Sequence, residues 1–413
     1  MSVCSIEFLL LLMFVSAGFF WLPGVRSRQV LLAFCNAGFL YSLVPNAVAW
    51  VALGLVIGTG YAITKVLLAH PRRSIFAAYL GLLLAAFLIL KQYEFLKIFL
   101  PPALFERSVI VVGLSYMLFR QIHVMVDSLQ GQIERFSLWT YLNYQLNLFG
   151  LLAGPIQRYQ EFQQCWSRLE PVLADWYEVY RAYLRVFFGV IKIVVAATAC
   201  LWIYERLADG LAHGTLTEDL TTAKTVVAFL LLLYLYPAYI YFNFSGYCDI
   251  VIGGSSLLGL RMPENFNWPF FSRNMIEYCT RWHRTLGFWI RDYVFIPMYK
   301  TIAERWPSQA PSLAFLCYFI ALFLAGIWHG STWNFVIFGL LNGIGVSAAK
   351  LWETYLVKRY GRQGLRKYLQ SKAIRAIAIG ANFHYVCLTI LFFPANLNRS
   401  VLLLKNIALK TIF

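Results

Sequence analysis

The sequence contains 413 residues, of which 60% are hydrophobic and only 13% are charged. A soluble globular protein carries about twice that share of charged residues, so the composition excludes the soluble classes and indicates a polytopic membrane protein. The net charge of +16 does not indicate a nucleic-acid partner, because the bases lie in short loops beside apolar segments, where cytoplasmic loops and membrane lipid account for them.

The apolar residues form blocks of membrane-spanning length, which is about 17–25 residues for a helix. We therefore predict an all-α polytopic membrane protein with roughly 10–12 transmembrane or re-entrant helices. No internal repeat or soluble domain is visible, so residues 1–413 should form a single membrane-embedded domain. The candidate segments are 5–22, 29–44, 47–69, 75–100, 108–126, 137–153, 183–203, 223–242, 245–260, 312–328, 331–350 and 375–395.

The first apolar segment has no basic stretch before it and no small-residue cleavage site after it, so we expect a retained span rather than a signal peptide. The eight cysteines are scattered, and no two of them form a CxxC unit. The sequence therefore predicts neither a zinc site nor a disulfide framework. We expect no bound metal and no bound cofactor.

A polar group interrupts the apolar run from 226 to 260, and it contains Asn243, Ser245 and Asp249. An ionisable residue at membrane depth is a candidate functional residue by default. The alternative is a helix cap, in which Ser245 or Asp249 satisfies free backbone N–H groups. The residue types leave both interpretations open.

The second group lies between 275 and 293, where aromatic and aliphatic residues recur near helical spacing around His283. One interpretation is an amphipathic helix on the membrane surface. The other is a segment that folds into the protein and lines a passage. Three further residues of this segment are candidates for lining a substrate channel: Trp282, Arg291 and Asp292. We expect Arg291 and Asp292 to form a structural ion pair.

Two basic loops orient the chain, because Lys and Arg concentrate in cytoplasmic loops. Seven bases lie within 261–305 and eight within 350–375, so the segment between these loops should cross out and back. Residues 312–328 would reach about 25 Å as a helix at 1.5 Å per residue. His329 is therefore expected well away from the cytoplasmic face.

His329 lies between two uncharged runs, with Gly326 and Gly330 on either side. Its neighbours Trp328 and Asn334 are candidates for lining a substrate channel, as are Asn243, Ser245 and Asp249. An imidazole at this depth in the membrane needs a hydrogen-bond partner or a water-filled cavity. His329 is either a buried histidine whose nitrogens are hydrogen-bonded within the protein or a reactive histidine. We expect His123 and His384, which also lie inside spans, to bond to neighbouring helices, and His70 and His213 to be solvated.

Seven motifs occur in an order that resembles the membrane-bound O-acyltransferase family. They resemble most the branch with the membrane subunit of alginate O-acetylation and the D-alanyl transfer protein of teichoic acids. The motifs lie at 113–116 with 126–127, 153–159, 243–249, 263–267, 281–283, 289–293 and 326–330.

The resemblance implies a ring of helices around a thinned centre, which a cytoplasmic acyl donor and an acceptor reach from opposite sides. It also implies that His329 is the catalytic histidine and His283 the second functional position. The chemistry is consistent, because acyl transfer to a hydroxyl needs a base that is neutral at pH 7 and an imidazole with a pKa of about 6.5 qualifies. Asn243, Ser245 or His283 could orient the thioester.

We therefore expect a multi-pass O-acyltransferase of the bacterial inner membrane. Its co-substrate would be an acyl thioester, acetyl-CoA or an acyl carrier protein. Its acceptor would be a hydroxyl of an extracytoplasmic or exported polysaccharide, reached directly or through a partner protein. Acetyl is the expected group, with D-alanyl as the alternative. Two other classes remain open: a transporter or flippase, although no inverted repeat is visible, and a non-catalytic scaffold of an envelope-modifying complex.

Overall fold

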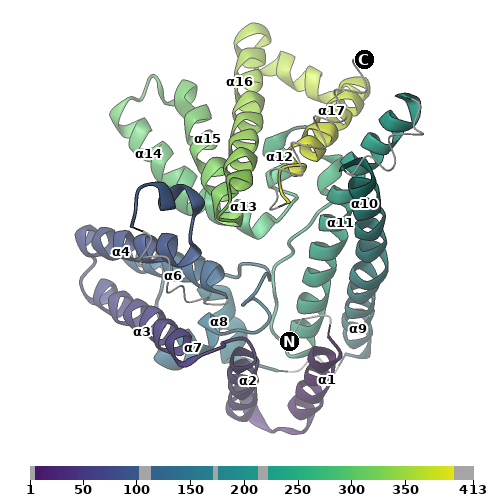
Figure 1. Cartoon of the computed structure of the whole chain (residues 1–413). Coiled ribbons are helices and arrows are strands. Elements are labelled where there is room, and N and C mark those ends of the chain that lie inside the picture. Colours follow the sequence, from purple (N-terminus) through teal and green to yellow (C-terminus); the bar gives the residue numbers. More distant parts are fainter. Residues whose placement is uncertain (1–4, 102–112, 171–174, 213–221, 395–413) are drawn as a thin grey trace. The chain divides into compact units, whose positions relative to one another are not determined.

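The computed structural model describes residues 5–101, 113–170, 175–212 and 222–394. These residues form helices and connecting loops, and no strand occurs among them (Figure 1). The all-α prediction is confirmed. The chain divides into two compact units: unit 1 comprises Met1–Ile193 with Ser245–Glu264, and unit 2 comprises Val194–Phe244 with Asn265–Phe413. The single domain and the ring of helices stay predictions.

Unit 1 contains the helices before the first crossing into unit 2. They are α1 (Ile6–Trp21), α2 (Gly24–Tyr41), α3 (Ala47–Ala69), α4 (Arg73–Lys91), the 3-10 helix η1 (Glu94–Ile98), α6 (Leu114–Leu129), α7 (Leu138–Gln145), α8 (Tyr159–Ser167) and α9 (Trp176–Ile191).

Two helices run from one unit into the other, namely the π-helix η3 (Lys192–Ala197) and α11 (Thr222–Leu257). The remaining helices belong to unit 2. They are α10 (Thr198–Ala212), the 3-10 helix η4 (Pro269–Phe271), α12 (Met275–Cys279), α13 (Arg284–Ile290), the π-helix η5 (Arg291–Phe295), α14 (Ile296–Arg305), α15 (Ala310–His329), α16 (Trp333–Gln370) and α17 (Lys372–Ile390).

Seven helices in the described part of the chain are long and apolar enough to cross a membrane, and Ile6–Trp21 is a shorter apolar helix. Large apolar side chains are exposed along them, for example Phe14 on α1 and Phe187 on α9, as lipid-facing surfaces require. The seven are Ala47–Ala69, Arg73–Lys91, Trp176–Gly210, Val226–Leu257, Ala310–His329, Trp333–Gln370 and Lys372–Ile390.

Three of the expected spans differ from the structure. The segment 137–153 contains only the eight-residue helix α7, followed by a loop. The segments 223–242 and 245–260 are one continuous helix, α11, so the polar group 243–249 does not join two separate spans. The helix continues because a lipid environment offers the backbone no other hydrogen-bond partners.

A close contact between two glycines explains what the polar part of α11 does instead. A β-carbon added to Gly246 would lie 2.7 Å from the backbone oxygen of Gly189 on α9. Small residues let two membrane helices approach backbone to backbone. The glycine in the middle of α11 is therefore a packing position against α9 rather than a break in the helix.

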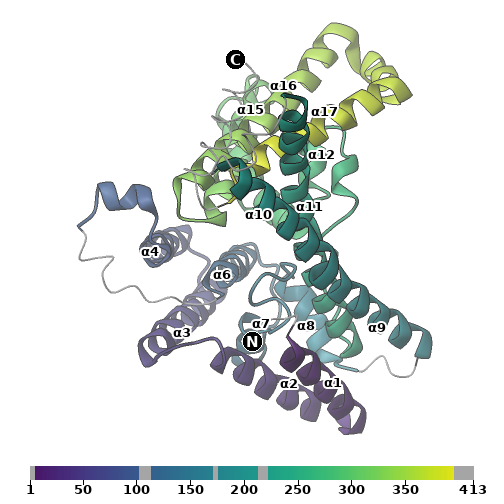
Figure 2. The ribbon, with the colours of Figure 1, turned by 45° about the vertical axis from the view of Figure 1, so that its right-hand side comes forward.

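The hairpin of α15 and α16 places His329 at its tip, with α15 ending at His329 and α16 beginning at Trp333. The two helices run side by side in both views (Figures 1 and 2). The expected pair of helices is therefore present, and its orientation across the membrane stays a prediction. Its second helix is longer than expected: α16 continues to Gln370 through a kink at Gly361, whose φ is 66°.

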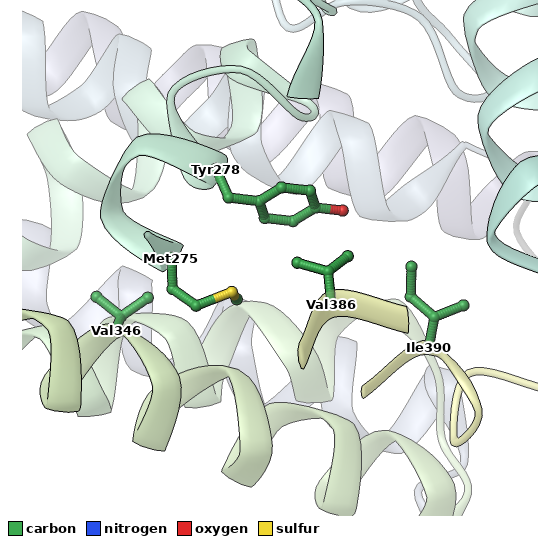
Figure 3. Packing of buried hydrophobic residues seen from close by; sticks show 5 residues of the cluster. All are labelled: Met275, Tyr278, Val346, Val386 and Ile390. Atoms are coloured by element: carbon green, nitrogen blue, oxygen red, sulfur yellow. The ribbon is translucent and has the colours of Figure 1, made fainter. Parts of the chain in front are cut away.

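An apolar cluster holds the short helix α12 against α16 and α17 (Figure 3). It consists of Met275 and Tyr278 from α12, Val346 from α16, and Val386 and Ile390 from α17, all of them buried. Burial of a side chain of this size stabilises the fold by about 1.5–3 kcal/mol. The cluster therefore anchors the segment that leads directly into His283.

Candidate active site

His283 lies in a break between α12 and α13, in the left-handed backbone region with φ 43° and ψ 49°. The predicted amphipathic helix over 275–293 is therefore interrupted at this residue. A left-handed conformation costs a residue other than glycine roughly 1–2 kcal/mol. Such a conformation persists only where the surrounding structure enforces it, and it is concentrated at functional sites.

The buried residue Asn265 enforces this conformation. Its backbone oxygen accepts a hydrogen bond from the N–H of Arg284 at 2.9 Å. Its side-chain oxygen accepts from the N–H of Thr285 at 3.2 Å and from the hydroxyl of Thr285 at 2.9 Å. The same oxygen lies 3.1 Å from Nδ1 of His283. Asn265 therefore clamps three consecutive residues around the break.

The imidazole of His283 is buried, and it lies edge to face with the ring of Phe244 at a centroid distance of 4.8 Å. Its Nε2 atom has no hydrogen-bond partner among the described residues. Burial, together with the nearby charge of His329, holds the pKa of His283 well below its usual value of 6.5. His283 is therefore neutral at pH 7.

His329 is partly exposed and lies in an aromatic environment at the end of α15. Its ring contacts Trp328, Phe338 and Phe393 at centroid distances of 4.9, 5.9 and 5.4 Å. The Trp328 ring also lies 6.5 Å from that of His283. Unit 2 thus brings together two histidines that are 46 positions apart in sequence, with one indole ring against both.

The other sequence candidates of unit 2 have structural contacts. Trp282 stacks on Tyr278 at 5.8 Å and belongs to the environment of the α12 cluster. Arg291 and Asp292 form the expected ion pair, with Nε and Oδ1 2.7 Å apart. Asn334 is buried and donates to the backbone oxygen of Pro394 at 2.7 Å, and Asn243 donates to Tyr239 at 3.3 Å. A channel role for these residues stays a prediction.

Asp249 and Ser245 belong to unit 1, and Asp249 is held by two cations of the preceding helices. Oδ1 accepts from Nε of Arg185 at 3.0 Å and Oδ2 from Nζ of Lys192 at 2.5 Å, while Arg185 also pairs with Glu264 at 2.6 Å. The capping alternative is wrong for Asp249, which lies well inside α11. The hydroxyl of Ser245 is buried without a hydrogen-bond partner among the described residues.

The partners of Asp249 were not singled out from the sequence, although a signal exists. Arg185 and Lys192 are seven positions apart, which places them on the same face of a helix, in a stretch that is otherwise long and apolar. Asn265 likewise lies in the motif at 263–267, whose local pattern does not single it out. Its role depends on contacts 18 to 20 positions away, which no local pattern reveals.

The remaining histidines have the contacts that their positions suggested. The buried Nε2 of His123 accepts from the N–H of Tyr159 at 3.0 Å, and Nε2 of His384 lies 2.9 Å from the hydroxyl of Tyr234. His70 is exposed, and His213 lies outside the described residues. Across the described ranges, no group of three or more His, Cys, Asp or Glu residues is arranged to hold a metal ion.

Comparison with known proteins places this geometry in a family. The model of "MBOAT, membrane-bound O-acyltransferase family" matches residues 90–393. The teichoic acid D-alanyltransferase of Bacillus subtilis (strain 168) is 29% identical over 283 residues, which are 67% of this chain and 66% of that protein. The Streptococcus thermophilus protein of the same name is 28% identical over 70% of this chain and 69% of its own length.

A second group of relatives carries a different name. The "Probable alginate O-acetylase AlgI" of Pseudomonas aeruginosa is 26% identical over 360 residues, which are 83% of this chain and 65% of that protein. The chain thus spans about two thirds of the length of these curated relatives. The family model covers most of the chain, including His283 and His329. The chain belongs to the membrane-bound O-acyltransferase family.

Proposed function

We propose that this protein is an O-acyltransferase that moves a small acyl group from a cytoplasmic thioester to a hydroxyl on the outer side of the membrane. The observation that carries the proposal is the arrangement of His329 and His283 around Trp328. It lies within the part of the chain that the family model covers. The seven long apolar helices agree with a multi-pass membrane protein, and the proposed location is the bacterial inner membrane.

In the proposed reaction, His329 is the general base. Its imidazole takes the proton of the acceptor hydroxyl while the oxygen attacks the thioester carbonyl. A carbon–oxygen bond forms, the carbon–sulfur bond breaks, and the proton passes to the departing thiolate. A base of this kind contributes roughly 10²–10⁴ to the rate. The partly exposed position of His329 at the end of α15 supports this assignment.

His283 has a different role in the proposal, because it is buried and neutral. A neutral imidazole with an open nitrogen can bind a polar group of either substrate next to the reacting atoms. Its ring is held by Asn265 and packs against Phe244 and Trp328. A catalytic group must be held in place to be effective. His283 is held by a hydrogen bond to Asn265, and His329 is held by packing against aromatic rings.

Two candidate reactions differ in the acyl group that is transferred. Residues 333–336 after His329 resemble the acetylating branch of the family, which favours acetyl. Acetyl would come from acetyl-CoA or an acyl carrier protein and go to an exported polysaccharide. The identity of 29% to a teichoic acid D-alanyltransferase favours D-alanyl, delivered from a carrier protein to a teichoic-acid-type polymer. Acetyl-CoA is the first donor to test. The acceptor can also be a partner protein that completes the transfer.

The test uses the purified protein in liposomes together with a hydroxyl-bearing acceptor polysaccharide, with labelled acetyl-CoA and labelled D-alanyl carrier protein offered separately as donors. We expect one of these thioesters to be consumed by the wild-type protein, and we expect H329A, expressed at a normal level, to lose that activity. A transporter would move its substrate unchanged, and a scaffold would leave both donors intact. Full activity in H329A would remove the proposed base.

A further inference from the structure

The hydrogen bonds around Asn265 define which nitrogen of His283 carries the proton. The backbone N–H of Thr285 can only donate, and it points at the side-chain amide of Asn265 at 3.2 Å. The amide must therefore turn its oxygen toward this N–H, since its NH₂ group would repel it. The hydroxyl of Thr285 donates to the same oxygen at 2.9 Å.

This oxygen also faces the imidazole, because it lies 3.1 Å from Nδ1 of His283. An amide oxygen accepts hydrogen bonds and cannot donate them. Nδ1 must therefore carry a hydrogen, and in the neutral ring the lone pair must be on Nε2. Asn265 is buried, with 1% of its surface exposed, so water does not compete for the oxygen.

Nε2 is thus a buried acceptor, and the described residues offer it no donor. Buried polar atoms in native proteins nearly always have a partner, and an exception needs an explanation. The atoms around it are aromatic: Phe244 lies at 4.8 Å and Trp328 at 6.5 Å between ring centroids. A bound substrate that brings an O–H or N–H donor would satisfy this atom.

We propose that Asn265 is a positioning residue that holds His283 as the Nδ1–H tautomer and thereby presents Nε2 as an acceptor to an O–H or N–H donor of a substrate. This inference rests on the proposed function for the identity of that donor, which is the acceptor's hydroxyl or an amide of the thioester's arm. The left-handed backbone at His283 serves the same end, because Asn265 also holds the two residues that follow His283, Arg284 and Thr285.

The direct test is nitrogen-15 NMR of the purified, histidine-labelled full chain without substrate. H283N identifies the signals of His283 by difference. We expect the wild-type ring to be protonated at Nδ1 and unprotonated at Nε2 at pH 7.5. In N265L we expect a mixture of tautomers, because the fixed acceptor is gone. A wild-type ring protonated at Nε2 would overturn the proposal, whatever the protein does with thioesters.

Activity provides the second readout, and it separates positioning from mere support of the fold. We expect N265L to lower kcat roughly 10- to 100-fold, the size of effect that removal of an orienting partner has elsewhere. N265D keeps an acceptor at the same place, so it should retain the Nδ1–H tautomer. Its carboxylate should raise the pKa of His283 and move the acid limb of kcat/KM upward by about one pH unit or more. An unchanged acid limb in N265D contradicts the proposal.

Asn274 offers a matched control. Its side-chain oxygen accepts from the N–H of Glu277 at 2.8 Å and caps α12 in the same region of unit 2. N274L should lower stability but leave the His283 tautomer and the pH profile as they are. If N274L mixes the tautomers and lowers kcat as N265L does, the effect belongs to the fold and the proposal fails. If wild type consumes neither thioester while its ring is Nδ1–H, the proposed function fails instead.

Discussion

Gly326 and Gly339 meet backbone to backbone: a β-carbon added to Gly326 would lie only 2.1 Å from the α-carbon of Gly339. This contact joins α15 to α16 one turn before His329. We expect G326A to lower the free energy of unfolding by about 1–3 kcal/mol, because overpacking at a close contact forces the helices apart. Thermal unfolding in detergent would measure it.

The control for this substitution is G380A on α17, where an added β-carbon meets nothing within 4 Å. That change should be neutral or slightly stabilising, since alanine is the better helix former. Equal effects of G326A and G380A would show that helix propensity, rather than the contact with Gly339, decides the outcome.

The ion pairs of Asp249 lead to a second prediction. Its side chain is 17% exposed and contacts Arg185 and Lys192, which are 29% and 33% exposed. D249A would leave two partly buried cations without this carboxylate. We expect a loss of about 1–3 kcal/mol in the free energy of unfolding, less than for a fully buried pair because solvent screens part of the interaction.

A matched surface pair shows what burial adds. Arg181 and Glu178 are 61% and 47% exposed and lie 3.0 Å apart on α9. E178A should therefore cost at most about 1 kcal/mol. Unfolding of D249A and E178A at the same midpoint would contradict a stabilising role for the Asp249 network.

The depressed pKa of His283 predicts a dependence of stability on pH. Burial and the charge of His329 lower the pKa of His283 well below 6.5 in the folded protein. As the pH falls through about 6.5, the unfolded chain binds a proton that the folded chain does not, so the free energy of unfolding decreases. We expect this decrease between pH 7 and pH 5 to be smaller in H283N, as measured by thermal unfolding at several pH values.

In that experiment the four histidines other than His283 and His329 contribute equally to wild type and variant, and His329 differs between them only through its interaction with His283. The difference between the two curves therefore reports His283. Parallel curves over this range would mean that His283 titrates normally in the folded protein.

Trp328 gives a prediction for activity, because its ring lies against both histidines. W328L should lower kcat roughly 10- to 100-fold without unfolding the protein, since small displacements of catalytic groups have large effects on the rate. W328F should lose less. W352L, which changes an indole that is 52% exposed on α16, should retain full activity in the same liposome assay.

The sequence predicted the elements whose patterns are local. The two uncharged runs around His329 predicted the hairpin of α15 and α16, and helical lengths of apolar residues predicted the long spans. The motifs predicted that His283 and His329 act together, and the structure places both rings against Trp328. The hairpin and the spans depend on composition or on residues that are close in sequence, whereas the pairing of the two histidines came from the family resemblance and their joint action stays a prediction.

The errors have a different origin. The group 243–249 contains residue types that usually end helices, yet α11 passes through it. Its Asp249 is neutralised by Arg185 and Lys192, which are 64 and 57 positions away. Similarly, the helix expected over 275–293 is broken at His283 because Asn265 offers it better hydrogen bonds. Tertiary partners decided both cases.

The left-handed backbone of His283 has a consequence for how this position should be probed. Substitution by alanine would remove the imidazole, and it would also place a residue that rarely adopts the left-handed region in a strained turn. Asparagine tolerates the left-handed region several-fold better than most residues, so it deletes the ring while sparing the turn. A comparison of H283N with H283A would therefore separate the effect of losing the imidazole from the effect of straining the backbone.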